Sequence, residues 1–183
     1  MASFLTLHSF CLFSILFAVT VTATNCASTA LKPTTHFRFY MHDDFTGYTG
    51  TKPTAMRIVT MPKLSINDTS PRTFGDVAVL NNLLTKGPSH ESELIGRAQG
   101  FSVRVADGGL VNALSLHLVF EHGTFAGSSI YMEGRIPLNE PIRESVLVGG
   151  TGQFRFARGY LISENYDYNL VTGGVVEVNV YVM

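Results

Sequence analysis

The sequence predicts an all-β protein, an eight-stranded antiparallel β-barrel with up-and-down meander topology. From Thr34 onward apolar and polar residues alternate with a period of two, and no run has the 3.6-residue period of an amphipathic helix. Glycine-containing turn signals separate the alternating runs, at residues 107–109, 121–123, 149–152 and 172–174. Closing such a meander into a barrel removes exposed strand edges, and a β-sandwich is the architectural alternative.

Each expected strand is a short alternating run. In residues 36–42, Phe37, Phe39 and Met41 share one face, and in residues 175–182 every second residue is a valine. A barrel of this size has an interior that side chains fill or that holds one small ligand. The remaining strands are expected at residues 55–61, 76–80, 96–106, 114–120, 129–134 and 154–163.

Length and composition indicate one neutral globular domain. The 183 residues include 13 Lys plus Arg and 14 Asp plus Glu, a formal net charge of −1. This balance gives no basic surface for nucleic acid and no polybasic membrane arm. Hydrophobic residues make up 45% and charged residues 15%, which favours a folded chain over a disordered one. The 2 cysteines exclude a disulfide-dense scaffold and a four-thiolate zinc site.

The N-terminal segment has the pattern of a secretory signal. Residues 1–31 carry no charged side chain, and residues 10–21 are almost entirely apolar. As a helix that apolar run rises about 18 Å, which is short of the roughly 30 Å hydrocarbon core of a membrane. We expect a cleaved signal peptide at 1–23, a flexible lead-in at 24–33, the barrel domain at 34–183 and export from the cell. The alternative is a single N-terminal membrane anchor.

A glycosylation sequon is consistent with export. Asn67-Asp68-Thr69 has the Asn-X-Thr pattern and lies in a polar stretch between Pro62 and Pro71. We therefore predict that Asn67 carries a glycan.

The first strand ends in the densest polar cluster of an apolar neighbourhood, His42-Asp43-Asp44. If Asp43 points inward, it shares the inner face with Phe39 and Met41, and desolvation raises its pKa toward neutrality. Such a carboxyl can act as a general acid or base. The alternative is that Asp43 or Asp44 only caps the turn that follows. His42 has the opposite parity and is expected to face out of the barrel.

Other chemistry-bearing patterns are weaker. Arg143 is either a pocket cation that orients a phenolate or carbonyl oxygen, or a solvated loop residue paired with Glu140 or Glu144. The histidine pairs do not have metal-ligand spacing, and no serine lies in a Gly-X-Ser-X-Gly elbow. We predict no metal site and no cofactor. The glycine run at 149–152 is expected to be a turn followed by a strand, so it offers no helix N-terminus to a phosphate.

Four segments together resemble the plant dirigent (disease-resistance-response) proteins: residues 39–43, 96–101, 141–144 and 149–160. The order and spacing of the segments match across residues 36–182. The resemblance implies an eight-stranded antiparallel barrel, assembly as a homotrimer or homodimer, and delivery to the apoplast.

The resemblance also implies an unusual activity. Dirigent proteins hold no oxidase centre, and a separate laccase or peroxidase makes phenoxy radicals from monolignols such as coniferyl alcohol. The barrel then directs radical coupling with one stereochemistry, as in lignan biosynthesis, and some members direct ring closure of a quinone methide. Orientation of the reactants, assisted by proton transfer, is the physical basis. Whether this chain is an enzyme in the strict sense is left open.

The family's functional residues map onto particular positions. The resemblance makes Asp43 the acid–base carboxylate and Arg143 the pocket arginine. We further expect Phe37, Phe39, Met41 and Phe101 to bind the substrate. Ile136 stands where lignan-forming members carry a second acid, and Ser102-Val103-Arg104 stands where they carry tyrosines.

The leading hypothesis is a secreted dirigent protein that controls coupling or cyclisation of plant phenolics. A non-catalytic barrel that binds phenolics or terpenoids in the cell wall is the alternative, and a cyclase that needs no oxidant is a third. No nucleic-acid partner is expected, and no membrane contact after signal cleavage.

Overall fold

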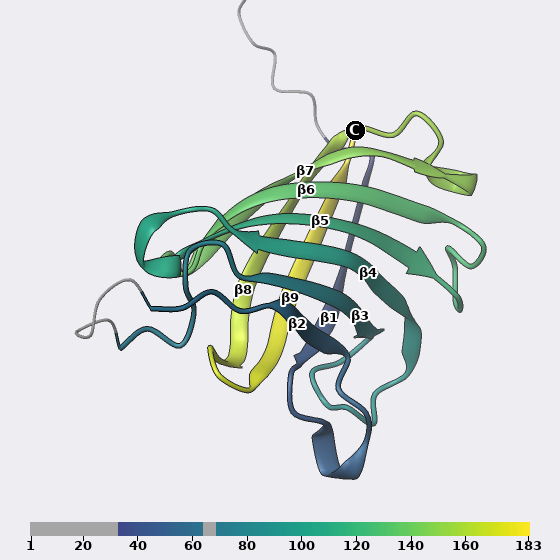
Figure 1. The fold of residues 1–183 in the computed structure, drawn as a ribbon. Coiled ribbons are helices and arrows are strands. Elements are labelled where there is room, and N and C mark those ends of the chain that lie inside the picture. Colours follow the sequence, from purple (N-terminus) through teal and green to yellow (C-terminus); the bar gives the residue numbers. More distant parts are fainter. Residues whose placement is uncertain (1–32, 64–68) are drawn as a thin grey trace, which may run out of the picture. The chain divides into compact units, whose positions relative to one another are not determined.

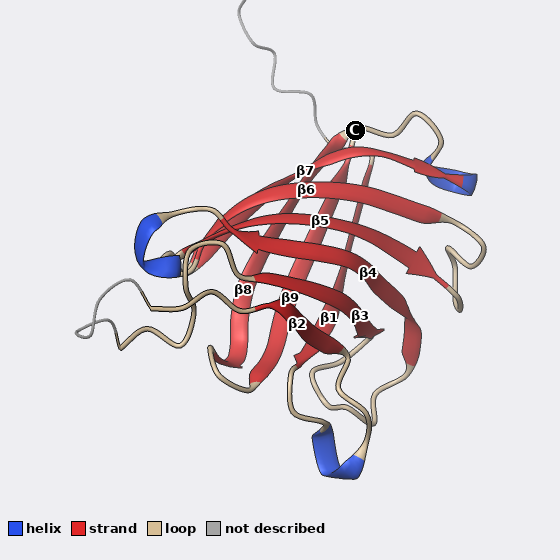
Figure 2. Cartoon of the chain, in the orientation of Figure 1, coloured by secondary structure: helices blue, strands red, loops and turns tan. Residues whose placement is uncertain are grey.

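The computed structural model describes residues 33–63 and 69–183. In these residues the chain forms antiparallel strands joined by short loops and 3-10 turns (Figures 1 and 2). The strands are β1 (Thr35–Asp44), β2 (Ala55–Val59), β3 (Val77–Thr85), β4 (Leu94–Arg104), β5 (Val111–Phe120), β6 (Ser129–Pro137), β7 (Ile142–Thr151), β8 (Gly159–Asn169) and β9 (Gly173–Val182). The 3-10 turns are η1 (Tyr48–Gly50), η2 (Asp107–Gly109) and η3 (Gly152–Phe154).

The sheet closes on itself through β1. Strands β3 to β9 pair in sequence order, and β1 pairs with β9 from Thr35↔Val182 to Asp44↔Gly173. On its other side β1 pairs with the end of β3, at Tyr40↔Thr85, Met41↔Leu84 and His42↔Leu83. Strands β1 and β3–β9 are therefore a closed eight-stranded antiparallel barrel, as the alternation predicts. The up-and-down order keeps each strand beside its sequence neighbour, which is the short-range connectivity typical of a meander.

Two details of the strand assignment differ from the expectation. Strand β2 lies outside the closed ring. It pairs with the first half of one edge of β3, and β1 pairs with the second half of that edge. Strand β7, which is absent from the expected set of strands, takes the missing place in the ring. In β7 the buried residues are the polar Arg143 and Ser145 together with Leu147, while Ile142 and Val146 are more than half exposed. This inverted alternation hides the strand from a search for buried apolar residues.

The glycine run after β7 also differs from the expected turn and strand. Gly149 and Gly150 continue β7 opposite Tyr131 and Ile130, and a register shift in β6 accompanies them. Residues 152–154 then form η3, and the next strand begins only at Gly159. The segment therefore forms a strand end and a short 3-10 turn in place of a hairpin.

Phenylalanine rings close one end of the barrel. The ring of Phe125, in the β5–β6 loop, lies 4.7 Å from that of Phe37 and 5.0 Å from that of Phe154, measured between centroids. Phe120 packs 5.8 Å from Phe125 and from Phe37. We call these four rings the aromatic plug. Such tilted and edge-on pairs are favourable beyond the apolar area that they bury.

The other end of the barrel is where the meander gathers polar residues. Strands β1, β4, β6 and β8 end at this rim, and β3, β5, β7 and β9 begin there. Asp43, Arg104 and Tyr168 therefore approach from strand ends, and Asn112 and Arg143 from strand starts. One rim collects side chains that are separated by up to 125 residues in sequence.

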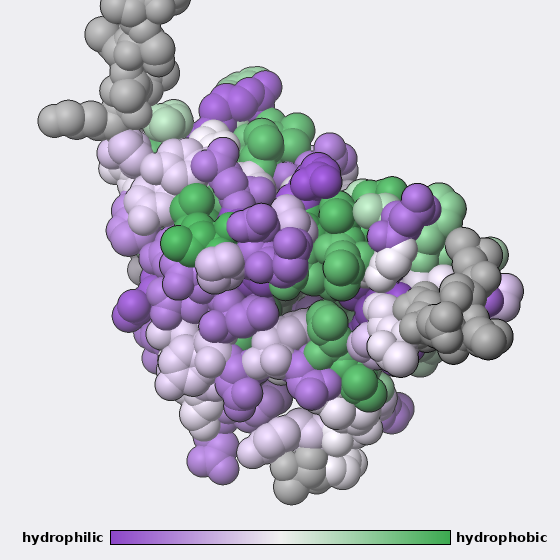
Figure 3. All heavy atoms as spheres, turned by 90° about the vertical axis from the view of Figure 1, so that its left-hand side faces the viewer, coloured by the Kyte–Doolittle hydropathy of each residue, from purple (hydrophilic) through white to green (hydrophobic). Residues whose placement is uncertain are grey.

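The outer surface is mixed in polarity. In the face shown in Figure 3, a band of apolar residues runs beside largely polar surface. No helix among residues 33–63 and 69–183 is long and apolar enough to cross a membrane. The expected signal peptide at 1–23, most of the lead-in at 24–33 and the predicted glycan site Asn67 lie outside the described residues.

Candidate functional site

A cavity opens inside the barrel between the aromatic plug and the polar rim. Its volume is about 1040 Å³, including the part that is open to solvent. The deep wall is apolar, and its members come from most strands of the barrel: Phe39, Met41, Leu80, Leu114, Leu116, Leu118, Met132, Ile136, Leu161, Val176 and Val178.

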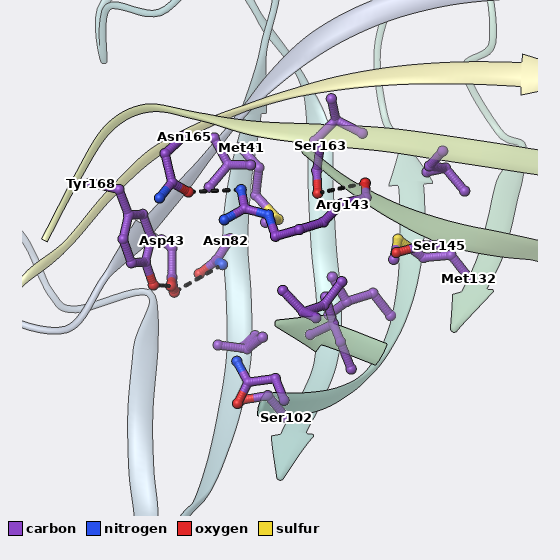
Figure 4. A pocket seen from close by; sticks show the side chains of 18 of the residues that line it. Met41, Asp43, Asn82, Ser102, Met132, Arg143, Ser145, Ser163, Asn165 and Tyr168 are labelled. Atoms are coloured by element: carbon purple, nitrogen blue, oxygen red, sulfur yellow. Dashed lines mark hydrogen bonds between the residues drawn. The ribbon is translucent and has the colours of Figure 1, made fainter. Parts of the chain in front are cut away.

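Asp43 points into this cavity and is 9% exposed. Its Oδ2 accepts a hydrogen bond of 2.5 Å from the Tyr168 hydroxyl, and its Oδ1 accepts one of 3.2 Å from Asn82 Nδ2 (Figure 4). Burial raises the pKa of Asp43 above its ordinary value, and the bonds from Tyr168 and Asn82 oppose this rise only in part. The carboxyl is thus fixed in place with its pKa moved toward the range useful for proton transfer.

Tyr168 is a functional residue that sequence reasoning missed. It lies near the end of β8, where the run from Ser163 to Asn169 is polar and gives no alternation signal. Burial and the neighbouring Asp43 raise the pKa of Tyr168, so the hydroxyl stays protonated and remains a hydrogen-bond donor. The pairing of β9 brings it to Asp43, because strands β1 and β8 lie on the two sides of β9.

Arg143 lies in the wall of the same cavity and is 5% exposed. Its Nη2 donates to Asn165 Oδ1 at 2.7 Å, and Ser163 Oγ donates to its backbone carbonyl (Figure 4). Its Nε is buried and has no hydrogen-bond partner among the described residues. The structure therefore places Arg143 in a strand facing the cavity, and the alternative of a solvated loop residue paired with Glu140 or Glu144 is wrong.

Two further arginines approach the rim, and sequence reasoning assigned neither to the cavity. Arg104, at the end of β4, lines the cavity, and its Nη1 donates to the Gly109 carbonyl at 3.0 Å. Burial and the charge of Arg72 lower the pKa of Arg104 to about 10, so it still carries its charge at neutral pH. Arg72 lies 2% exposed, with its guanidinium 4.3 Å from the Phe45 ring centroid.

The remaining residues expected in the site divide into two groups. Phe39 and Met41 line the cavity together with Asp43, as the period of two predicts. Phe37 has the same parity but lies in the aromatic plug, because it is at the far end of β1. Phe101 is 49% exposed on the outer face of β4, whereas its neighbour Ser102 faces the cavity. The structure thus does not place Phe37 or Phe101 in the cavity wall.

His42 faces out of the barrel, as expected, but is 1% exposed. Its ring lies 4.3 Å from that of His90 in the β3–β4 loop, and its Nε2 is 2.7 Å from Thr85 Oγ1. The outward direction of His42 agrees with the period of two. The side chain is nevertheless buried, because the β3–β4 loop covers this part of the outer face. Burial, followed by the neighbouring His90, lowers the pKa of His42 to about 4.

The arrangement can bind an aromatic ligand and move a proton, with one acid as the proton carrier. Asp43 is the only acidic side chain among the described residues that line the cavity. Ile136 occupies the opposite wall, so no second carboxylate faces Asp43. In residues 33–63 and 69–183 no group of three or more His, Cys, Asp or Glu side chains converges on a position for a metal ion.

The model of the Dirigent-like protein family matches residues 34–183, which is the whole barrel. The chain belongs to the dirigent family. Dirigent protein 21 of Arabidopsis thaliana is 37% identical over 179 residues, with 92% of this dirigent protein and 92% of the relative covered. Pterocarpan synthase 1 of Glycine max is 38% identical over 180 residues, with the same coverage of 92% on both sides.

Solved structures agree in fold. The pterocarpan synthase dirigent protein GePTS1 superposes with a TM-score of 0.72 at 34% identity, over 81% of this chain and 88% of that one. The pterocarpan synthase dirigent protein PsPTS1 gives 0.73 at 32% identity, over 84% of this chain and 97% of that one. These similarities confirm the predicted family and the all-β barrel, and they support a dirigent-type stereoselective role.

Proposed function

We propose that this dirigent protein sets the stereochemistry with which a plant phenol forms a new bond inside the barrel. The reaction is either coupling of phenoxy radicals, such as those of coniferyl alcohol in lignan-type biosynthesis, or ring closure of a quinone methide. The observation that carries the proposal is the Asp43–Tyr168 hydrogen bond at the rim of an apolar cavity that also holds Arg143. The cavity restricts the approach of the reacting atoms, and this restriction is the source of selectivity.

The geometry favours ring closure over coupling. Formation of a bond between two radicals needs no proton carrier, whereas ring closure does. In ring closure a hydroxyl of the substrate adds to the methide carbon, a C–O bond forms, and the exocyclic electron pair moves into the ring. The hydroxyl proton passes to the ionised Asp43, and the quinone oxygen becomes a phenolate beside Arg143. Return of the proton from Asp43 to the phenolate completes the step without an oxidant.

Chiral chromatography of the products tests the proposal with two substrates. The first is coniferyl alcohol with a one-electron oxidant, and the second is a para-quinone methide that carries its own nucleophilic hydroxyl, with no oxidant present. Each is run with and without the folded protein. We expect an enantiomeric excess that requires the protein, and we expect it with the quinone methide.

The variant Asp43→Asn keeps the size of the side chain and removes the proton carrier. We expect it to fold and to give a nearly racemic product from the quinone methide. Asp167→Asn, the same change at an exposed position of β8, is the matched control and should keep full selectivity. Full enantiomeric excess with Asp43→Asn contradicts the role of Asp43. Ligand binding without any change in the products points to the alternative of a non-catalytic scaffold barrel.

We propose the cellular setting along with the reaction. The N-terminal pattern supports secretion to the apoplast, where a laccase or peroxidase acts separately to generate the radicals or the quinone methide. A homotrimer or homodimer is supported by the outer face of β7, where Ile142 and Val146 are 59% and 58% exposed. Large apolar side chains exposed on one strand face are found in contacts between protein chains.

A further inference from the structure

The rim of the cavity holds more buried positive charge than negative charge. Arg104 and Arg143 line the cavity, at 6% and 5% exposure, and Asp43 is the only acid that lines it among the described residues. Arg72 lies behind them, close enough for its charge to act on both Arg104 and Asp43. Asp76 is a second buried acid whose charge acts on Arg72 and Arg104, but it does not line the cavity, so the lining itself holds two arginines and one acid.

No salt bridge joins these arginines to an acid within the described residues, although the charges of Asp76 and Asp43 act on Arg72 and Arg104, and that of Glu164 acts on Arg143. Arg104 donates to the Gly109 carbonyl, Arg143 donates to the amide oxygen of Asn165, and Arg72 lies over the ring of Phe45. Buried Nε atoms of Arg72 and Arg143, and Nη2 of Arg72, have no hydrogen-bond partner at all. Buried guanidinium nitrogens without an acceptor are costly, so these groups favour a ligand that supplies an acceptor with negative charge.

Asp43 does not supply this charge. Both of its oxygens already accept hydrogen bonds from neutral donors, Asn82 and Tyr168. Its burial favours the protonated form, which carries no charge. Counted over the side chains that line the cavity, Arg104 and Arg143 leave an excess of one positive charge when Asp43 is ionised, and of two when it is protonated.

The position of Arg104 separates its role from that of Arg143. Arg104 comes from the end of β4, opposite Asn112 on β5, whereas Arg143 comes from the start of β7, which adjoins β8. Between them the wall holds the apolar Leu114 and Ile136 and the polar Asn112. A ligand that places its phenolic oxygen at Arg143 and Asp43 can therefore extend a second polar group toward Arg104.

We propose that the physiological substrate of this site is an anionic phenol, in which a carboxylate binds Arg104 while the phenolic end lies at Asp43 and Arg143. The inference rests on the proposed function for the identity of the phenolic end. A carboxylate fits the planar fork of a guanidinium with two parallel hydrogen bonds, which a neutral alcohol does not reproduce. The apolar wall then holds the aromatic ring.

Equilibrium binding of a matched pair of phenols tests the inference. Ferulate and coniferyl alcohol share the same ring and chain length, and they differ in a terminal carboxylate against a terminal alcohol. Isothermal titration of the purified protein at pH 7 should show ferulate binding about tenfold more tightly or better, as expected for one charge-assisted contact. Arg104→Gln should remove this preference by weakening ferulate alone, and Arg104→Lys should retain part of it.

Arg135→Gln is the matched control, because Arg135 is exposed on β6 next to the cavity residue Ile136. It should bind both phenols as the unchanged protein does. Circular dichroism establishes that each variant is folded. If Arg104→Gln does not fold, the preference of the unchanged protein for ferulate over coniferyl alcohol still tests the anion site.

Equal affinity for the two phenols, tighter binding of coniferyl alcohol, or no binding of either overturns the inference. So does a ferulate preference that survives in Arg104→Gln. A ferulate preference that depends on Arg104, in a protein that gives racemic products, supports the anion site and rejects the proposed function. Stereocontrol without a ferulate preference supports the proposed function and rejects the anion site. The failures of the two proposals are therefore distinguishable.

Discussion

At the scale of single residues, Asp43 links the candidate chemistry to stability. Burial raises its pKa in the folded state, so the folded protein holds this proton more tightly than the unfolded chain does. The stabilising effect is therefore complete at low pH, and it is lost as the pH rises from the ordinary carboxyl value of about 3.9 through the raised value. A site that needs an ionised Asp43 has a cost in stability at neutral pH.

Asp43→Asn is expected to raise the free energy of unfolding at pH 7, by about 1.4 kcal/mol for each unit by which the pKa of Asp43 is raised. The amide oxygen can still accept from Tyr168 or Asn82. Urea unfolding at several pH values checks this, and the gain should shrink toward pH 4. A variant that is less stable than the unchanged protein at pH 7, but equal to it at pH 4, contradicts the direction of the shift.

His42 gives a second, opposite pH dependence. Thr85 Oγ1 donates to the Gly87 carbonyl, so it accepts from His42 Nε2–H, and His42 Nδ1 is left buried without a partner in the described chain. The ring is therefore neutral in the fold, with its pKa lowered to about 4. Because the folded pKa lies below the unfolded value of about 6.5, stability from this group is complete above pH 6.5 and is lost as the pH falls toward 4.

We expect His42→Gln to flatten the fall in stability between pH 6.5 and pH 4, since glutamine can donate to Thr85 without titrating. Thermal unfolding midpoints across this range measure the slope. The exposed His122→Gln is the control, and its slope should match that of the unchanged protein. An unchanged slope in His42→Gln shows that another group is responsible.

At the scale of elements, β4 needs glycine at two positions where the backbone of β5 lies too close for a side chain. A Cβ atom on Gly100 would lie 2.0 Å from the carbonyl oxygen of Ser115, and one on Gly96 would lie 1.9 Å from that of Val119. No side chain fits at these distances without separation of the strands. The two glycines therefore hold the β4–β5 ladder in register beside the cavity residues Ser102 and Arg104.

Gly100→Ala is expected to lower the free energy of unfolding by about 2–4 kcal/mol, as severe clashes with backbone do. Gly149→Ala in β7 is the matched control, because its Cβ would meet only the end of the Arg158 side chain, at 3.6 Å. Guanidinium unfolding of both variants makes the comparison. Equal stabilities would show that the β4–β5 spacing relaxes freely.

The contrast between β1 and β7 explains how far sequence reasoning reaches. In β1 the inner residues Phe39 and Met41 are apolar, so the alternation reveals the strand and the direction of Asp43. In β7 two of the three buried residues, Arg143 and Ser145, are polar because they line the cavity. A strand whose inner face is used for chemistry loses the hydrophobic pattern on which sequence interpretation relies.

At the scale of the whole molecule, the barrel separates a structural end from a chemical end. The aromatic plug shares no residue with the cavity wall, and the polar rim lies at the opposite ends of the same strands. Stability and selectivity are therefore expected to respond to different substitutions.

Phe125→Ala, in the aromatic plug, is expected to cost about 3 kcal/mol of stability by removing a large ring from the packed cluster. The enantiomeric excess should be unchanged at a temperature where the variant is folded. Calorimetric unfolding and chiral chromatography of the same sample test both statements. A loss of selectivity at full folding would mean that the plug also shapes the cavity.

The sequence by itself determined the all-β class, the family, the inward direction of Asp43 and the apolar residues beside it. Local alternation carries that information, because a period of two sets which side chains share a face. The tertiary structure decided the rest: the exclusion of β2 from the ring, the partnership of Asp43 with Tyr168 and Asn82, and the gathering of Arg72, Arg104 and Arg143. Those contacts depend on barrel closure, which joins strands far apart in the chain. No local sequence pattern predicts contacts between such distant residues.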